Sequence, residues 1–408
     1  MEIFTLLFIL AVGWVGRLVF ERLRLPPLVG EILVGLIIGP PVLGLVGGVI
    51  KGVEVTGLIG KPIFEWTPAM DLLATLGIFF LMFHAGLTTD PKQLAGKMKH
   101  FVIMGTSGTI FPLIFGFLAT WWITGEMWAA ILVGVAISGT SMAVKVRMLD
   151  DLNLLRTKMG YAMMGSSIVD NILSFMVLSV VIKAVTAGGV GVLDIVKVVL
   201  TVAAFFAAVL LLGWWLYPKI GKFMCEPGEK SFVFALILGL LIAGIAHEIG
   251  IHLIVGAYLA GLLLREEILG KAAENLYTRF HTLSHGFFAP IFIVSVAFHV
   301  NLNVFVEYPI LLVAVALAAF AGKMIGIYGA SRLLGFEKKE ALAMGWGMNS
   351  RGVVEMVFAI VGLEIGILTD VHISILVVVA ILTTLIAPIG VAHVLKIKSA
   401  TSRKQSPR

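Results

Sequence analysis

The stretch Leu28-Val-Gly-Glu-Ile-Leu-Val-Gly-Leu-Ile-Ile38 has a counterpart far along the chain, Ile254-Val-Gly-Ala-Tyr-Leu-Ala-Gly-Leu-Leu-Leu264. Both carry Val-Gly, then Leu, then Gly-Leu at the same offsets. Each belongs to an apolar run, and such runs cross about 30 Å of hydrocarbon when they are helical. Chance similarity between apolar segments is the alternative explanation. We take the pair as an internal repeat, whose symmetry depends on the number of spans between its two copies.

The composition is that of a protein buried in lipid. Of the 408 residues, 59% are hydrophobic and 13% are charged, whereas a soluble domain carries about 25% charged residues. Lipid admits only helices and closed barrels as spanning structures, and these apolar runs are too long for barrel strands. We therefore predict an all-α integral membrane protein with about thirteen transmembrane helices. The expected spans are residues 3–21, 28–46, 71–88, 100–123, 127–146, 159–184, 190–217, 231–247, 251–265, 282–300, 308–333, 340–363 and 372–396.

Basic residues alternate between the two sets of loops that these spans create. One set holds only Lys51, Lys61, Lys183 and Lys197. The other set is rich in Lys and Arg, which marks cytoplasmic loops. An extracellular N-terminus and a cytoplasmic C-terminus follow, in a multi-pass protein of the cell membrane. The basic loop residues are Arg22, Arg24, Lys92, Lys97, Lys99, Arg147, Arg156, Lys158, Lys219, Lys222, Lys230, Arg265, Lys271, Arg279, Arg332, Lys338 and Lys339, with Lys396, Lys398, Arg403, Lys404 and Arg408 in the tail.

The two repeated stretches lie in the second and the ninth span, so they cross the membrane in opposite directions. An inverted-topology repeat of this kind is typical of secondary transporters. The predicted organisation is a first repeat at 1–187, a linker helix at 188–229, a second repeat at 230–396 and a short basic cytoplasmic tail at 397–408.

Two ionisable residues stand at mid-span. Asp170 lies in Gly165-Ser-Ser-Ile-Val-Asp-Asn-Ile-Leu-Ser174, and Lys323 lies in the middle of the span 308–333. A charge at the bilayer centre costs roughly 2.5–3.5 kcal/mol on insertion scales, so it normally has a function or a partner. Ser166 lies one helical turn before Asp170, which gives a stripe of oxygen atoms suited to a small hard cation. The alternative is a purely structural ion pair between Asp170 and Lys323.

Two spans contain helix-breaking segments in matching places of the two repeats, Ser138-Gly-Thr-Ser-Met142 and Gly345-Trp-Gly-Met-Asn-Ser-Arg-Gly352. Glycine beside Ser, Thr and Asn lowers helix propensity. Interrupted segments in corresponding positions indicate the binding site of a transporter. We expect Thr140, Ser141, Ser166 and Asn171 to supply neutral oxygens for a cation beside Asp170, with Na⁺ as the expected ion. Close helix packing by small residues is the alternative.

The remaining polar residues of the spans are assigned supporting roles. Glu31, Arg351 and Glu355 are expected to pair with one another, and Lys145 is expected to extend toward the cytoplasmic interface. The sequence has no G-x-x-x-x-G-K-[ST] phosphate loop, no HExxH and no GxSxG. These absences argue against ATP-driven transport and against protease or esterase chemistry within the chain, so we expect no enzyme activity and no cofactor. The net charge of +6 comes from the basic loops, so we also expect no nucleic-acid partner.

At this point the sequence resembles the monovalent cation:proton antiporter-2 family, over almost the whole chain and in order. The resemblance implies a homodimer of thirteen-helix protomers, with a core transport domain at about 100–184 plus 308–396 and a dimerisation domain formed by the rest. It also implies two crossed broken helices and exchange of Na⁺, K⁺ or Li⁺ for H⁺. The stretches that carry it are Leu25–Pro40, Phe80–Asp90, Gly139–Met142, Ile168–Asn171, Ile254–Gly261, Gly322–Met324 and Asn349–Gly352.

The sequence departs from the family at the residue that carries the ion. The family's span 6 has two adjacent polar residues, of which the second is the ion-carrying carboxylate and the first, when it is Asp, pairs with a lysine that matches Lys323. Here the pair is Asp170 and Asn171. We predict a secondary cation:proton antiporter that works by alternating access, with Na⁺ as the first choice of cation. A cation channel, an organic-anion symporter and a non-transporting or impaired homologue are the alternatives.

Overall fold

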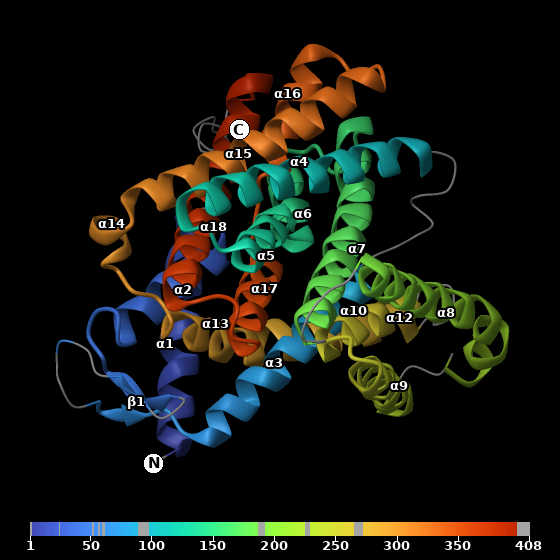
Figure 1. Ribbon diagram of the computed structural model, residues 1–408. Coiled ribbons are helices and arrows are strands. Elements are labelled where there is room, and N and C mark those ends of the chain that lie inside the picture. The colour runs from blue at the N-terminus through green and yellow to red at the C-terminus, as the bar shows by residue number, and fades with distance from the viewer. Residues whose placement is uncertain are drawn as a thin grey trace, which may run out of the picture. The chain divides into compact units, whose positions relative to one another are not determined.

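The computed structural model describes residues 2–23, 25–50, 53–55, 58, 62–88, 98–186, 192–224, 229–264 and 272–397 (Figure 1). Several basic residues on which the predicted orientation rests lie outside these ranges: Arg24, Lys51, Lys61, Lys92, Lys97, Arg265, Lys271 and the tail from residue 398. Within the described ranges, nine helices are long and apolar enough to cross a membrane, and three shorter apolar helices accompany them. The predicted helical membrane fold is confirmed.

A helix or a group of consecutive helices stands at each of the thirteen expected spans. The chain divides into two compact units. Unit 1 comprises Met1–Val19, Gly30–Asp90 and Phe175–Phe298, and unit 2 comprises Phe20–Val29, Pro91–Ser174 and His299–Arg408. The predicted core and dimerisation domains have different boundaries and stay predictions.

Unit 1 contains most of α1 (Glu2–Arg22) and α2 (Pro27–Ile38), together with α3 (Pro68–Leu87) and the second part of α7 (Lys158–Thr186). It continues with α8 (Val192–Met224), α9 (Glu229–Glu248), α10 (Leu253–Leu263), α12 (Ala272–His281), the π-helical segment η2 (Thr282–Phe288) and α13 (Ala289–Ala297). Helices α3 and α10 pack closely because of glycine: a Cβ atom added to Gly86 would lie 2.8 Å from the backbone nitrogen of Leu262.

Two boundaries in unit 1 differ from the prediction. The span expected at 28–46 ends at Ile38, because Gly39-Pro40-Pro41 follows and proline disfavours helix in the residue before it. The helical segment expected at 282–300 begins ten residues earlier, at Ala272. The prediction also missed a small sheet, in which β1 (Val46–Ile50) pairs antiparallel with β2 (Val53–Val55) and parallel with β3 (Phe64–Glu65).

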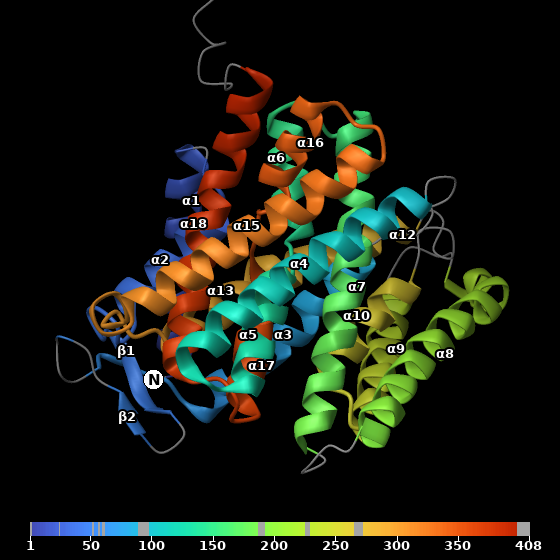
Figure 2. The ribbon, with the colours of Figure 1, turned by 45° about the horizontal axis from the view of Figure 1, so that its top comes forward.

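Unit 2 holds α4 (Met98–Thr124), α5 (Met127–Ser138), α6 (Met142–Asp151) and the first part of α7. Its last segment, from His299 onward, holds α14 (Val304–Glu307), α15 (Pro309–Leu333), α16 (Lys338–Gly347), α17 (Val353–Glu364) and α18 (Asp370–Leu395). Helices α4 and α15 lie side by side in both ribbon views (Figure 2). Their close approach depends on Gly322, whose added Cβ would lie 2.6 Å from Pro112 Cα.

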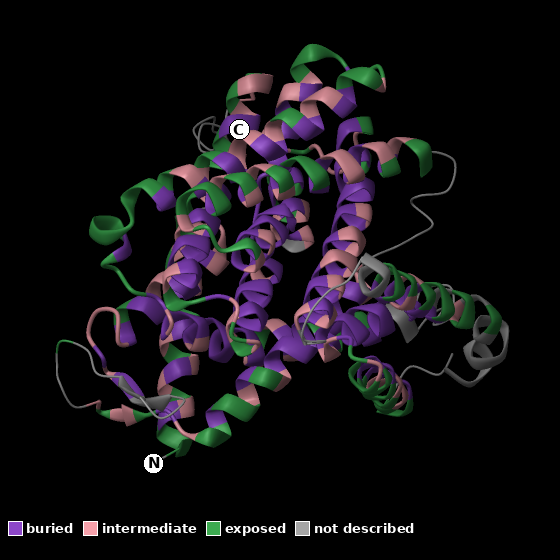
Figure 3. Ribbon diagram, viewed as in Figure 1, coloured by how far each residue is buried: buried purple, intermediate pink, exposed green. Residues whose placement is uncertain are grey.

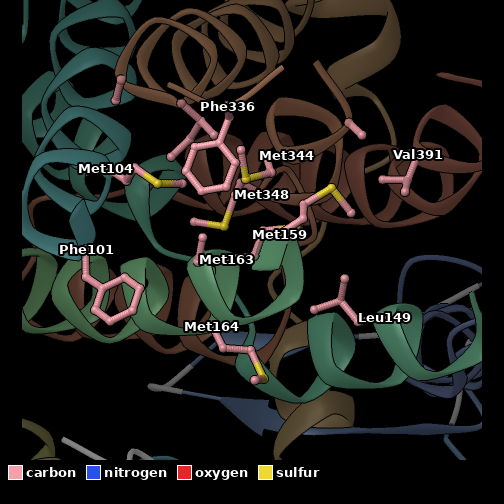
Figure 4. Close-up of a cluster of buried hydrophobic side chains, with 14 of the residues drawn as sticks. Phe101, Met104, Leu149, Met159, Met163, Met164, Phe336, Met344, Met348 and Val391 are labelled. Carbon is pink, nitrogen blue, oxygen red and sulfur yellow. The ribbon is translucent and has the colours of Figure 1, made fainter. Parts of the chain in front are cut away.

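Burial separates the short helices of unit 2 from the long ones around them. Helices α5 and α17 are purple along most of their length in Figure 3, which marks them as buried. One end of the unit is filled by a methionine-rich cluster in which Met104, Met163, Met344 and Met348 gather around Phe336 (Figure 4). Methionine side chains are flexible and fill irregular spaces, which suits a cluster that joins the long helices α4 and α7 to α16.

Candidate ion-binding site

Asp170 lies on α7 and is completely buried in unit 2. Three side chains donate hydrogen bonds to its carboxylate. The Thr109 hydroxyl on α4 donates to Oδ1 at 2.6 Å, the Thr140 hydroxyl donates to Oδ2 at 3.1 Å, and Lys323 Nζ on α15 donates to Oδ2 at 2.7 Å. Charge-assisted hydrogen bonds of this length are the stronger kind. The structure therefore brings together the two ionisable residues that the sequence placed at mid-span.

The ammonium of Lys323 makes two further hydrogen bonds, both to backbone carbonyls. It donates to Gly108 O at 2.7 Å and to Ser138 O. The Gly108 carbonyl has no helical partner because Pro112, four residues later in α4, lacks an N–H. The proline thus leaves an acceptor inside the helix, and the lysine occupies it. All three N–H groups of the ammonium have acceptors, which is what a buried cation requires.

The first broken span is confirmed: α5 ends at Ser138 and α6 begins at Met142. The last carbonyls of a helix have no partner within it and carry the negative end of the helix dipole. Here Lys323 bonds to Ser138 O, and the Arg351 guanidinium bonds to Ile137 O and reaches Gly139 O at 3.4 Å. Two cations therefore neutralise the end of α5. The Ser141 hydroxyl accepts from Val144 N at 3.4 Å and caps α6.

The second broken span is also confirmed, with α16 ending at Gly347 and α17 beginning at Val353. The backbone of the two breaks meets where Ser141 N donates to Ser350 O at 3.2 Å. Thr384 on α18 holds Arg351 in place, because its hydroxyl accepts from Arg351 N at 3.2 Å and donates to Arg351 O at 2.9 Å. The crossed broken helices implied by the resemblance are therefore present.

Glu355 is the second buried carboxylate of unit 2, in the first turn of α17. Its Oε1 atom lies 4.0 Å from Arg351 Nη1, and neither carboxyl oxygen has a hydrogen-bond partner among the described residues. Of the three residues expected to pair with one another, Arg351 and Glu355 do so. Glu31 belongs to unit 1, and its described ion pair is with Arg17, at 3.9 Å.

Lys145 does not extend toward the interface as expected, because it is completely buried in unit 2. Its ammonium donates to the Thr140 hydroxyl at 3.1 Å and to the Ser167 hydroxyl. Side chains on a helix point back toward its N-terminus. Because α6 begins at Met142, just after the break, the Lys145 side chain points toward the break and the site. The prediction placed Lys145 beyond the break, toward the cytoplasmic side, and missed this inward direction of its side chain.

Among the other expected site residues, the structure separates Ser166 from the rest. Its hydroxyl bonds to Met163 O at 3.1 Å and contacts Met348 Sδ at 3.8 Å, while the neighbouring Ser167 takes the place beside Lys145. Asn171 is buried, and its Oδ1 atom has no hydrogen-bond partner among the described residues. Sequence reasoning missed Thr109, since a threonine in an apolar helix gives no signal of its own.

Comparisons with known proteins show the family of this chain. Residues 6–397 match the family described as "Sodium/hydrogen exchanger, transmembrane". The chain is 30% identical over 390 residues to the Na(+)/H(+) antiporter NhaS4 of Synechocystis, which covers 90% of this chain and 91% of that protein. It is 28% identical over 395 residues to the Na(+)/H(+) antiporter of Enterococcus hirae, covering 93% and 94%. The Na(+)/H(+)-K(+) antiporter GerN of Bacillus cereus is 28% identical over 369 residues, covering 90% and 89%.

The fold is also that of a solved structure. The sodium proton antiporter MjNhaP1 from Methanocaldococcus jannaschii superposes with a TM-score of 0.72 at 18% sequence identity, covering 97% of this chain and 98% of that one. At this identity the likeness concerns the fold alone. The resemblance inferred from the sequence is confirmed by the family match: the chain belongs to the transmembrane sodium/hydrogen exchanger family.

Proposed function

We propose that this protein exchanges Na⁺ for H⁺ across the membrane by alternating access, with the Asp170 carboxylate as the negative group for which cation and proton compete. The observation that carries the proposal is a buried carboxylate beside the break between α5 and α6, bonded to Thr109, Thr140 and Lys323. The relatives named as Na(+)/H(+) antiporters support the choice of ions.

Oxygen atoms of the right kind surround this carboxylate. Hard cations prefer carboxylate, carbonyl, amide and hydroxyl oxygens. The Thr140 hydroxyl bonds to Asp170, and the next residue, Asn171, has an amide oxygen without a hydrogen-bond partner in the described part of the chain. Ser141 lies at the same helix break. We propose Asp170, Asn171, Thr140 and Ser141 as the ion site, with Lys323 as the partner that the entering cation must displace from the carboxylate.

The charge moved per cycle depends on Lys323. A single carboxylate that alternates between one Na⁺ and one H⁺ gives electroneutral exchange. If Lys323 releases a proton whenever the cation takes the carboxylate, exchange becomes electrogenic. Measuring exchange with and without an imposed membrane potential separates the two cases, since only the electrogenic cycle responds to the potential.

The test of the function is Na⁺-driven proton movement in proteoliposomes that contain a trapped pH dye. The protein should move protons against each added cation, with Na⁺, K⁺ and Li⁺ tried in turn. Conductance without dependence on pH would indicate a channel, and a requirement for an added organic solute would indicate a symporter. Absence of all three activities would contradict transport.

A variant at Asn171 tests whether Asp170 is the group that carries the ion. Asn171→Asp restores the pair of carboxylates that the family usually carries. If wild-type exchange is near zero and this change raises it strongly, the claim that Asp170 carries the ion is wrong. If wild type exchanges and the variant alters only the apparent affinity or the charge moved, the claim stands.

Orientation and assembly complete the proposal: a homodimer in the cell membrane, with the N-terminus outside and the C-terminus in the cytoplasm. The alternation of basic loops supports the orientation. The native Cys225 is first replaced by serine, and a single cysteine is then placed at the C-terminus. Labelling of that cysteine by an impermeant thiol reagent in intact cells would overturn the orientation. Chemical cross-linking in the membrane tests the dimer.

A further inference from the structure

Lys145 is a buried cation that the proposed exchange does not use. Its ammonium is completely buried, and its two described hydrogen bonds go to hydroxyl groups, those of Thr140 and Ser167. Lys323 differs, because it has a carboxylate oxygen at 2.7 Å. A buried ammonium without a directly bonded carboxylate is costly, so this arrangement calls for a function or for a compensating charge nearby.

The hydroxyl groups that bind Lys145 are bonded in a way that turns their lone pairs toward the ammonium. The Thr140 hydroxyl donates its hydrogen to Asp170 Oδ2, and the Ser167 hydroxyl donates to Met163 O at 2.6 Å. Both oxygens are therefore acceptors toward Lys145. An ammonium and a dehydrated monovalent cation seek the same ligands, namely oxygen lone pairs. The Thr140 hydroxyl therefore links the Lys145 ammonium to the Asp170 carboxylate.

The buried charges of unit 2 do not balance. Among its described buried side chains, Lys145, Lys323 and Arg351 are opposed by only two carboxylates, Asp170 and Glu355. With all five ionised, the interior already carries one excess positive charge. A further cation beside Asp170 would be repelled by Lys145 through a medium of low dielectric constant. Of the three cations, Lys145 alone has no described ion pair.

We propose that the Lys145 ammonium is a built-in competitor of the transported cation, occupying the Thr140 and Ser167 oxygens in its place and so setting the cation affinity. The inference rests on the proposed function and adds a specificity-determining residue to it. The flexible four-carbon stem of lysine lets the ammonium leave these oxygens while its backbone stays fixed in α6. The cation then binds where the ammonium was, next to the carboxylate.

The test compares two neutral variants, Lys145→Met and Lys145→Gln, with wild type. The Na⁺ dissociation constant is measured by isothermal titration calorimetry on the purified full-length protein, and the apparent KM for Na⁺ by dye dequenching in proteoliposomes. Both constants should fall by about tenfold or more, because a positive charge a few ångström from the cation is removed. The control is Lys338→Met, an exposed lysine at the start of α16, which should stay within about twofold of wild type because exposed charges are well screened.

Each outcome decides one claim. Tighter Na⁺ binding in both neutral variants supports the competitor. Unchanged or weaker binding in the folded variants overturns it, as does failure of both neutral variants to fold, which would assign Lys145 to stability. Tighter Na⁺ binding in Lys145→Arg, which keeps the charge, also overturns it. If wild type and all variants move no protons, the proposed function fails, and calorimetry still decides whether Lys145 competes with Na⁺.

Discussion

The two helix breaks of unit 2 differ in what they present to the interior. The break at 139–141 offers acceptors: the carbonyls that end α5 and the hydroxyl of Thr140, which accepts from Lys145. The break at 348–352 offers a donor, the Arg351 guanidinium, which binds the carbonyls of the first break and the Ala319 carbonyl at 3.1 Å. Repeats that match in sequence position therefore have complementary chemistry, and one break satisfies the unpaired groups of the other.

The carboxylates near the two breaks differ in the same way. Asp170 receives three hydrogen bonds, whereas Glu355 has no hydrogen-bond partner among the described residues and lies 4.0 Å from a single cation. Several charge-assisted or hydroxyl donors fix the position of a carboxylate. This difference in contacts supports the proposal that Asp170, rather than Glu355, binds the cation.

The largest expected effect comes from exchanging each carboxylate for its amide. Asp170→Asn should lower Na⁺-driven proton movement at least about 100-fold, because it removes the negative charge that binds the cation and places an amide against Lys323. Glu355→Gln is the matched control. It should keep exchange, with a moderately raised KM for Na⁺, since one balancing negative charge is lost. If Glu355→Gln loses exchange in proteoliposomes while Asp170→Asn keeps it, Glu355 is the carrier instead.

The next largest effect is on stability, at the cation that joins α15 to the first break. Lys323→Ala should lower the free energy of unfolding by about 3–5 kcal/mol, because it leaves the Asp170 carboxylate buried and uncompensated and removes the donor to the Gly108 and Ser138 carbonyls. The melting temperature in detergent reports the change. Lys338→Ala at an exposed position should leave it unchanged. An unaltered melting temperature in Lys323→Ala would contradict a stable pair with Asp170.

A smaller loss is expected at the donor of the second break. Arg351→Met should destabilise the protein by about 2–3 kcal/mol, because buried carbonyls of Ile137 and Ala319 lose a charged donor. The change also leaves Glu355 buried without its cation. The double variant with Glu355→Gln should therefore be more stable than additivity predicts, by about 1 kcal/mol in a double-mutant cycle. Strict additivity of the two melting shifts would show that the 4.0 Å contact carries no coupling.

Some of this site could be predicted from the sequence. Glycine beside Ser, Thr and Asn marks both helix breaks, and the cost of a charge in lipid points to Asp170 and Lys323 as partners. The Gly108 carbonyl could have been found as well, from the proline four residues later.

The remainder depends on helix rotation and on tertiary packing. Consecutive residues of a helix lie about 100° apart, so spacing alone did not decide which of Ser166 and Ser167 faces the site. The prediction for Lys145 was wrong because the helix break before α6 decides where its side chain points. Its distance from the end of the span does not. Thr109 reaches Asp170 only because glycines bring α4 and its neighbours together: a Cβ atom on Gly105 would lie 2.6 Å from Val169 Cβ.

The smallest expected effect concerns the residue that holds the second break in position. Thr384→Val keeps the shape of the side chain but removes the hydroxyl that bonds to both Arg351 N and Arg351 O. The free energy of unfolding should fall by about 1–3 kcal/mol, because two buried backbone groups lose their partner. Thr383→Val is a control one residue away, since the Thr383 hydroxyl bonds at 2.8 Å to Val379 O, a carbonyl of its own helix. That control should change stability by less than about 0.5 kcal/mol, because the helix ladder supplies this carbonyl with another donor. Equal shifts of the melting temperature in the two variants would show that Thr384 does not fix Arg351, and the break would then be held by the contact between Ser141 and Ser350.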